Sequence, residues 1–190
     1  PPTERPGETG SSNLAGFFRA GLLRSEFYWR RSGLKVRGVS HIAVCGADLE
    51  RSLEFYRDIL GLTVKMHAVQ EMGQRPGARS AHMYEHPRKS RMVADVYVDD
   101  PGSTQPYLVL TSHPGDQVGG EPIKLDQKGI SHISFGVEDL NAFAKELIAK
   151  DVPLAGTMED FTDAAGNVRT VFVYDPDGIL VQFDEGPPAY

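Results

Sequence analysis

The chain of 190 residues has a single cysteine, Cys45, and therefore cannot form an internal disulfide. No hydrophobic run approaches the ~20 residues that a helix needs to span a bilayer, which excludes an integral helical membrane protein. Basic residues are outnumbered, 20 Lys and Arg against 26 Asp and Glu, and the net charge of −6 argues against a general nucleic-acid binder. The fold must therefore depend on a core built from the 40% of residues that are hydrophobic.

Several catalytic motifs are missing as well. The sequence contains no G-x-S-x-G, H-E-x-x-H, Walker A or G-x-G-x-x-G pattern, so the corresponding hydrolases, metalloproteases and nucleotide-binding folds lack support. The chain also begins at Pro1 without a Met. A cleaved signal peptide is therefore an alternative to the cytoplasmic location that we expect.

The N-terminal segment differs in charge from the rest. Residues 1–37 hold seven basic and three acidic residues, although the whole chain is acidic. We expect a flexible arm over 1–12 and an amphipathic helix with its linker over 13–36. Our interpretation is that this helix docks on its own domain or on a second subunit of a homodimer. The alternative is contact with an anionic membrane surface.

An internal repeat organises the remaining residues. Residues 38–49 (GVSHIAVCGADL) and 129–140 (GISHISFGVEDL) are identical at six of twelve positions. Chance would supply about one identity in twenty positions, so we infer a duplication. We therefore expect a first module over 37–127 and a second over 128–190.

Each copy has the same order of expected elements. A β-prone run leads to an aspartate that caps a helix, Asp48 in the first copy and Asp139 in the second. Apolar residues at helical spacing predict helices that end near Gly61 and Asp151. Further β-prone segments follow at 62–69, 92–98 and 107–111, and in the second copy at 152–155 (weakly), 168–174 and 179–184. Turns at 99–102 (DDPG) and 175–178 (DPDG) predict hairpins. The pattern predicts an α+β fold in which two βαβββ modules form a curved mixed sheet around a cleft.

His41 and His132 occupy equivalent places in the two copies. If the copies pack around an approximate twofold axis, the two imidazoles come from equivalent strands and can converge on one point. Such a pair is the beginning of a site for a divalent metal ion, Fe, Zn, Mn or Ni. The alternative is that duplication copied a structural histidine twice.

Longer motifs resemble a known family. The run 48–62 (DLERSLEFYRDILGL), preceded by SHIAV at 40–44, is similar to the first module of the vicinal oxygen chelate superfamily. The run 173–183 (VYDPDGILVQF) is similar to its closing hairpin. That family includes glyoxalases, methylmalonyl-CoA epimerases, extradiol dioxygenases, fosfomycin-resistance enzymes and bleomycin-binding proteins. The resemblance covers about residues 36–185 and is specific for the fold more than for function, because the family has several chemistries and some members without metal.

The resemblance also implies where a metal would be held. Family members that bind metal take ligands from the first and last strands of each module, and His41 and His132 match the first-strand positions. The last strand of the first module has Val109, which cannot ligate, and that of the second has Gln182 where the family usually has Glu. Asp184, on the same strand face, is the alternative ligand. We expect this neutral donor set to bind a divalent ion less tightly than a set with a carboxylate.

Other residues have less defined roles. The loop over 72–91 contains His82, Tyr84 and His86, which are candidates for a lid over the substrate. The catalytic residues are not identified from the sequence. The carboxylates that stay open as a general base are Glu71, Glu85, Asp95 and Asp184.

Two functions are compatible with these features. The first is a metal-dependent enzyme that acts on a small molecule with adjacent oxygens, as a lyase, an isomerase or a ring-cleaving dioxygenase. The second is a metal-free protein that binds or sequesters a small molecule. The paired histidines favour the enzyme, which we prefer, whereas Val109 and Gln182 favour the binding protein.

Overall fold

The structure, a computed structural model, describes residues 36, 38–74, 83–86, 88–99, 106–113 and 119–186. The chain divides into two units, Pro1–Gly38 and Val39–Tyr190, and every helix and strand named below belongs to the second. The arm expected over 1–12, the helix expected over 13–36 (apart from Val36) and residues 100–102 of the first expected hairpin turn lie outside the described residues.

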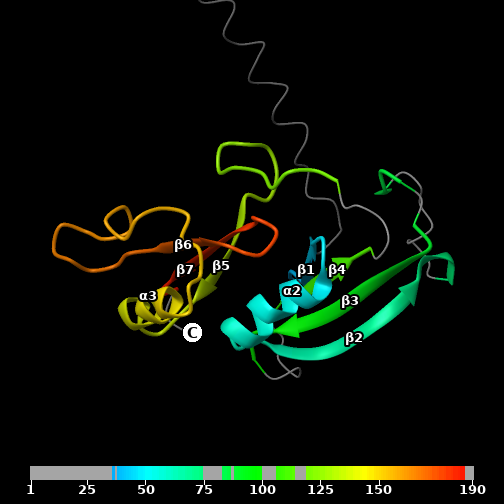
Figure 1. Ribbon diagram of the computed structural model, residues 1–190, viewed down its shortest axis with the longest axis horizontal. Helices are drawn as coiled ribbons and strands as arrows, with labels where there is room; N and C mark the ends of the chain where they lie inside the picture. The colour runs from blue at the N-terminus through cyan, green and yellow to red at the C-terminus, as the bar shows by residue number, and fades with distance from the viewer. Residues whose placement is uncertain are drawn as a thin grey trace, which may run out of the picture. The chain divides into compact units, whose positions relative to one another are not determined.

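Four strands of the first module form one sheet (Figure 1). In spatial order they are β1 (His41–Cys45), β4 (Tyr107–Ser112), β3 (Ser90–Tyr97) and β2 (Thr63–Glu71). β1 pairs in parallel with β4, whereas the other neighbours are antiparallel. A short 3-10 turn, Met72–Gln74, follows β2. The three strands predicted after the first helix are therefore confirmed, and β1 forms one edge of the sheet.

The first helix begins where the sequence predicts it. The Asp48 carboxylate accepts a hydrogen bond from the Glu50 backbone N at 2.9 Å and so caps α2 (Leu49–Leu53). The helix continues as a π-helical segment, η1 (Glu54–Ile59). It ends before Gly61, whose φ of +78° is a left-handed conformation that glycine adopts readily. In Figure 1, α2 lies in front of β1 and β4.

The second module forms a smaller sheet. Its strands, in spatial order, are β5 (His132–Gly136), β7 (Leu180–Asp184) and β6 (Val171–Tyr174). β5 is parallel to β7, and β6 is antiparallel to it. Asp139 caps α3 (Leu140–Ala149) by accepting a hydrogen bond from the Ala142 N at 2.9 Å. The weak strand predicted at 152–155 is reduced to one isolated bridge between Leu154 and Val173.

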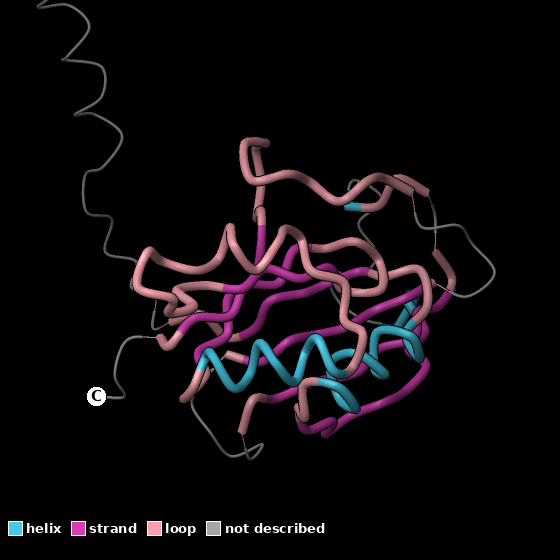
Figure 2. Tube along the Cα trace, turned by 60° about the vertical axis from the view of Figure 1, so that its left-hand side comes forward, coloured by secondary structure: helices cyan, strands magenta, loops and turns pink. Residues whose placement is uncertain are grey.

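The predicted α+β fold is confirmed, and its strands form two mixed sheets that no strand ladder joins within the described residues. Figure 2 shows the helices lying against the strands. Both modules contribute to a single hydrophobic core, whose members include Leu49, Leu53, Tyr56, Leu110, Leu140, Leu147, Val173 and Phe183. No helix within the described segments has the length and apolar character that a membrane crossing requires.

The second hairpin turn joins the two modules. Gly178 N donates to the Asp175 carbonyl at 3.0 Å, which confirms the tight turn. The Asp175 side chain is 5% exposed and accepts a hydrogen bond from the Tyr56 hydroxyl at 3.0 Å. Asp177 accepts another from the Ala47 N at 2.8 Å. The turn therefore attaches the end of the second sheet to the first helix.

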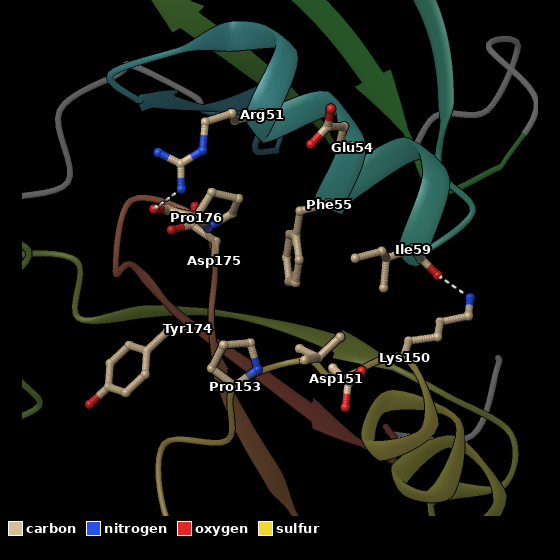
Figure 3. Close-up of a pocket in the computed structure, with 11 residues that line it drawn as sticks. Arg51, Glu54, Phe55, Ile59, Lys150, Asp151, Pro153, Tyr174, Asp175 and Pro176 are labelled. Atoms are coloured by element: carbon tan, nitrogen blue, oxygen red, sulfur yellow. Dashed lines mark hydrogen bonds between the residues drawn. The ribbon is translucent and has the colours of Figure 1, made fainter.

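A cavity of about 220 Å³ lies beside this junction (Figure 3). The Arg51 guanidinium donates to the Pro176 carbonyl at 3.4 Å, and the Lys150 ammonium donates to the Ile59 carbonyl at 3.0 Å. Figure 3 shows Phe55 between these two contacts. His41, His132 and Gln182 do not line the cavity. The candidate ligands therefore lie elsewhere in the fold.

Candidate functional site

His41 is the first residue of the edge strand β1 and is exposed. Its register partner is Tyr107 on β4, and the two ring centroids are 5.6 Å apart. Tyr107 in turn stacks on Tyr97 of β3 at 4.7 Å. Partial burial, with Tyr107 and Asp95 nearby, raises the pKa of Tyr97. The His41 ring therefore ends a row of aromatic side chains that crosses three strands.

His132 has the same place in the second module. It is the first residue of β5, whose register partner is Leu180 on β7, and it is half-buried. Its ring packs edge-on against Phe172 of β6, with centroids 5.5 Å apart. In both modules the histidine thus begins an edge strand that pairs in parallel with the last strand of its module.

Gln182 lies on the same face of the sheet as His132. Its register partners are Ser134 on β5 and Phe172 on β6. It is two residues beyond Leu180, the register partner of His132, which places the Cα atoms of His132 and Gln182 about 8 Å apart by strand geometry. The Gln182 amide nitrogen donates to the Thr170 hydroxyl at 3.1 Å. Imidazole and amide side chains are long enough to approach each other across this distance.

Asp184 shares that face but lies two residues further along β7, opposite Gly136. Strand geometry separates its Cα from that of His132 by about 14 Å. The Asp184 carboxylate accepts hydrogen bonds from the Ser134 hydroxyl at 2.9 Å and from the Gly186 N at 2.7 Å. The register therefore favours Gln182 over Asp184 as the partner of His132.

Val109 in the first module is buried at 8% exposure, between Ala43 on β1 and Asp95 on β3 in the register. Asp95 is half-buried and shares the sheet face of His41, because Val109 and Tyr107 are two residues apart on β4. Of the carboxylates considered as a base, Asp95 is on the face of His41 and Asp184 on that of His132.

The candidate lid residues are only partly described. His82 lies outside the described residues, and His86 is exposed. Tyr84 is half-buried and its ring lies edge-on to His113, with centroids 6.3 Å apart. Their position over a substrate stays a prediction.

A second cavity, of about 180 Å³, lies between the edge strands β1 and β5. His132 and Cys45 both line it, together with Ile42 and Ile133. His41 is not among its lining residues. The edges of the two sheets therefore face each other, whereas the convergence of His41 and His132 on one point stays a proposal.

The candidate ligands differ in the donor atoms that they offer a metal ion. Imidazole nitrogens suit Zn, Fe and Ni, and an amide oxygen is a weaker, neutral donor. Within the described segments, no group of three or more His, Cys, Asp or Glu residues is arranged so that it could hold a metal ion. By donor chemistry alone, His41, His132 and Gln182 would supply a divalent ion with a neutral set, which lacks a carboxylate to compensate its charge.

Sequence reasoning missed the hydroxyl groups around these candidates. The Ser40 hydroxyl lies 3.1 Å from Nδ1 of His41, and the Ser131 hydroxyl lies 3.0 Å from Nδ1 of His132. The signal was present, because Ser-His is part of the repeated motif at 38–49 and 129–140. The Thr170 hydroxyl, which contacts Gln182, lies outside the repeated motif, so the sequence did not point to it.

Comparison with known proteins identifies the family. The family model described as Glyoxalase/Bleomycin resistance protein/Dioxygenase superfamily matches residues 38–183. No curated protein sequence matches the chain.

Solved structures show the same fold. The trypanothione-dependent glyoxalase I of Leishmania major is 24% identical, with a TM-score of 0.53 over 79% of this chain and 88% of that chain. A glyoxalase family protein from Bacillus cereus is 14% identical, with a TM-score of 0.62 over 80% of this chain and 95% of that chain. A glyoxalase I mutant from Zea mays is 17% identical, with a TM-score of 0.54 over 78% of this chain and 45% of that chain.

The resemblance found in the sequence is thus confirmed by a family match that spans both modules and by the likeness of the fold. The chain belongs to the Glyoxalase/Bleomycin resistance protein/Dioxygenase superfamily.

Proposed function

We propose that the protein is a metal-dependent enzyme that acts on a small molecule with two adjacent oxygens. The observation that carries this proposal is the equivalence of His41 and His132. Each is the first residue of an edge strand that is parallel to the last strand of its module. A ligand site shared by the two modules requires equivalent positions of this kind, and this is why the pair favours a metal over a structural histidine copied by duplication.

Four side chains have defined roles in this proposal, three as ligands and one as a base. His41 and His132 supply imidazole nitrogens, and Gln182, on the face of His132, supplies an amide oxygen. The ion, when bound, acts as a Lewis acid that stabilises negative charge on the substrate oxygens. Asp95, on the face of His41, is a carboxylate that can accept a proton from the substrate. The reaction class is that of an isomerase, a lyase or a ring-cleaving dioxygenase.

A metal-free binding protein is the second candidate function, and Val109 favours it. This buried valine stands at the last-strand ligand position of the first module. With Val109 and Gln182 at both last-strand positions, the donor set has no charge to offset a dication. In this alternative the two histidines line a binding surface for a small molecule.

Metal content tests the proposal. The protein, purified without a histidine tag, is incubated with Zn, Fe(II), Mn or Ni, desalted and analysed for bound metal. We expect stoichiometric metal in the parent chain and its loss in both His41→Ala and His132→Ala. His86→Ala, which removes an exposed histidine of the loop, is the matched control and should keep its metal. A metal-free parent chain would support the binding protein instead, and a metal that both variants retain would show that His41 and His132 do not hold it.

Mixing the two variants tests how the site is assembled. In a homodimer whose sites each combine His41 of one copy with His132 of the other, a hybrid of the two variants has one intact site. Equimolar His41→Ala and His132→Ala, unfolded and refolded together, would then regain part of the metal. If both histidines of one chain hold the ion, the mixture stays free of metal.

A further inference from the structure

Each candidate ligand has a hydroxyl group within hydrogen-bond distance of one of its side-chain nitrogen atoms. The Ser40 hydroxyl lies 3.1 Å from Nδ1 of His41, and the Ser131 hydroxyl lies 3.0 Å from Nδ1 of His132. The Thr170 hydroxyl lies 3.1 Å from the amide nitrogen of Gln182. The atoms that these contacts leave for a ligand are Nε2 of both rings and the amide oxygen.

The direction of the Thr170 contact is fixed by a second hydrogen bond. The Thr170 hydroxyl donates to the Phe183 carbonyl at 3.4 Å, so its own proton is already used. It can therefore only accept from Gln182, which must present its NH₂ group there. The amide oxygen of Gln182 consequently points away from Thr170.

The serine contacts act on the tautomer of each ring. A neutral imidazole that binds a metal through Nε2 carries its proton on Nδ1, and that N–H needs an acceptor. Ser40 and Ser131 place a hydroxyl oxygen at hydrogen-bond distance from this atom in both modules. The near-equal distances show that the repeat preserves the contact as well as the residues.

We propose that Ser40, Ser131 and Thr170 are positioning residues that orient the metal-binding atoms of His41, His132 and Gln182. This inference rests on the proposed function. It explains why the Ser-His dipeptide occurs in both copies. The serine hydroxyl accepts a hydrogen bond from Nδ1–H, and the Nε2 lone pair stays available for the ion. Thr170 has the equivalent role for the amide.

Metal affinity gives the first readout. We measure Zn binding by competition with a chelator in Ser40→Ala, Ser131→Ala and Thr170→Val. We expect each to bind about 10-fold more weakly or worse, as is typical when an outer partner of a ligand is removed. Ser131→Thr and Thr170→Ser, which keep the hydroxyl, should restore the affinity. Ser134→Ala is the matched control, because that hydroxyl bonds to Asp184, which lies farther from His132 than Gln182 does, and not to His41, His132 or Gln182.

The second readout needs no metal. Long-range ¹H–¹⁵N NMR at a pH where histidine is neutral separates the Nδ1–H and Nε2–H tautomers. We expect His41 and His132 to favour Nδ1–H in the parent chain and to shift towards Nε2–H in the corresponding serine-to-alanine variants. Unchanged tautomers together with unchanged affinities would overturn the inference. A parent chain that binds no metal would overturn the proposed function, and the tautomers would still decide whether the serines orient the rings.

Discussion

Asp175 and Tyr56 form a buried pair across the junction of the two modules. Both side chains are nearly inaccessible, and the Tyr56 hydroxyl donates to the Asp175 carboxylate at 3.0 Å. The other carboxylate oxygen accepts from the Asp177 and Ile179 N atoms. Burial raises the pKa of Asp175 above its usual value, although these hydrogen bonds oppose the shift. Burial and the neighbouring Asp175 also raise the pKa of Tyr56.

The raised pKa of Asp175 predicts a pH dependence of stability. A group whose pKa is higher in the folded than in the unfolded state stabilises the fold fully below the unfolded pKa, here 3.8, and loses that contribution as pH rises through the folded pKa. We therefore expect the unfolding free energy to contain a component that falls as pH rises above about 4. Asp175→Asn should flatten that component, measured by urea unfolding between pH 4 and 7.

Asp126→Asn, at an exposed position, is the control for this prediction and should leave the pH profile unchanged. Identical profiles for the parent chain and Asp175→Asn would contradict the role given to this carboxylate.

The close packing around Gly46 leads to a second prediction, on the stability of a single-residue variant. It is buried, and a Cβ at this position would overlap an Asp177 carboxylate oxygen and lie 2.9 Å from the Ser52 hydroxyl. Gly46→Ala should therefore lower the unfolding free energy by about 1 kcal/mol, because the Asp177 carboxylate must move and weaken its hydrogen bond with the Ala47 N. Urea unfolding of Gly73→Ala gives the control, because among the described residues, chain neighbours apart, no atom lies within 4 Å of the added Cβ. Equal losses in the two variants would argue against a close approach at Gly46.

At the scale of elements, helix starts were the best predicted features. Asp48 and Asp139 both cap as the sequence indicates, because a short acidic side chain can reach the first free backbone N–H groups. The π-helical form of η1 was not predicted. The spacing of apolar residues does not show whether each backbone N–H bonds to the carbonyl four or five residues earlier. The strand predicted at 152–155 contains Pro153, which has no N–H to donate, and the pairing stops at one bridge.

The cap at α3 gives a prediction at this scale. Asp139→Ala removes the acceptor of the Ala142 N–H and should cost about 1 kcal/mol of unfolding free energy. Thermal and urea unfolding measure the change. Glu138→Ala, which removes the neighbouring exposed carboxylate, is expected to change stability by about 0.5 kcal/mol or less. A loss in Asp139→Ala no larger than in Glu138→Ala would show that the cap contributes little.

At the scale of the whole molecule, the repeat predicted the fold because each copy carries its own strand, cap and helix signals. It could not predict that the turn at 175–178 attaches to Tyr56 and Ala47, since contacts between modules leave no periodic pattern. Within the candidate site, the equivalence of His41 and His132 was readable from their spacing. The hydroxyl contacts at Nδ1 depend on side-chain rotamers, which the residue pattern does not determine.

The central claim is that the duplicated histidines hold one ion, and X-ray absorption at the metal edge tests it most directly. Outer-shell scattering from imidazole rings counts the histidines bound to Zn in the loaded protein. We predict two imidazoles in the parent chain; at Zn concentrations high enough to load the weakened variants, we predict one in His41→Ala and one in His132→Ala. A zinc environment without imidazole, or one that neither substitution changes, would contradict the account.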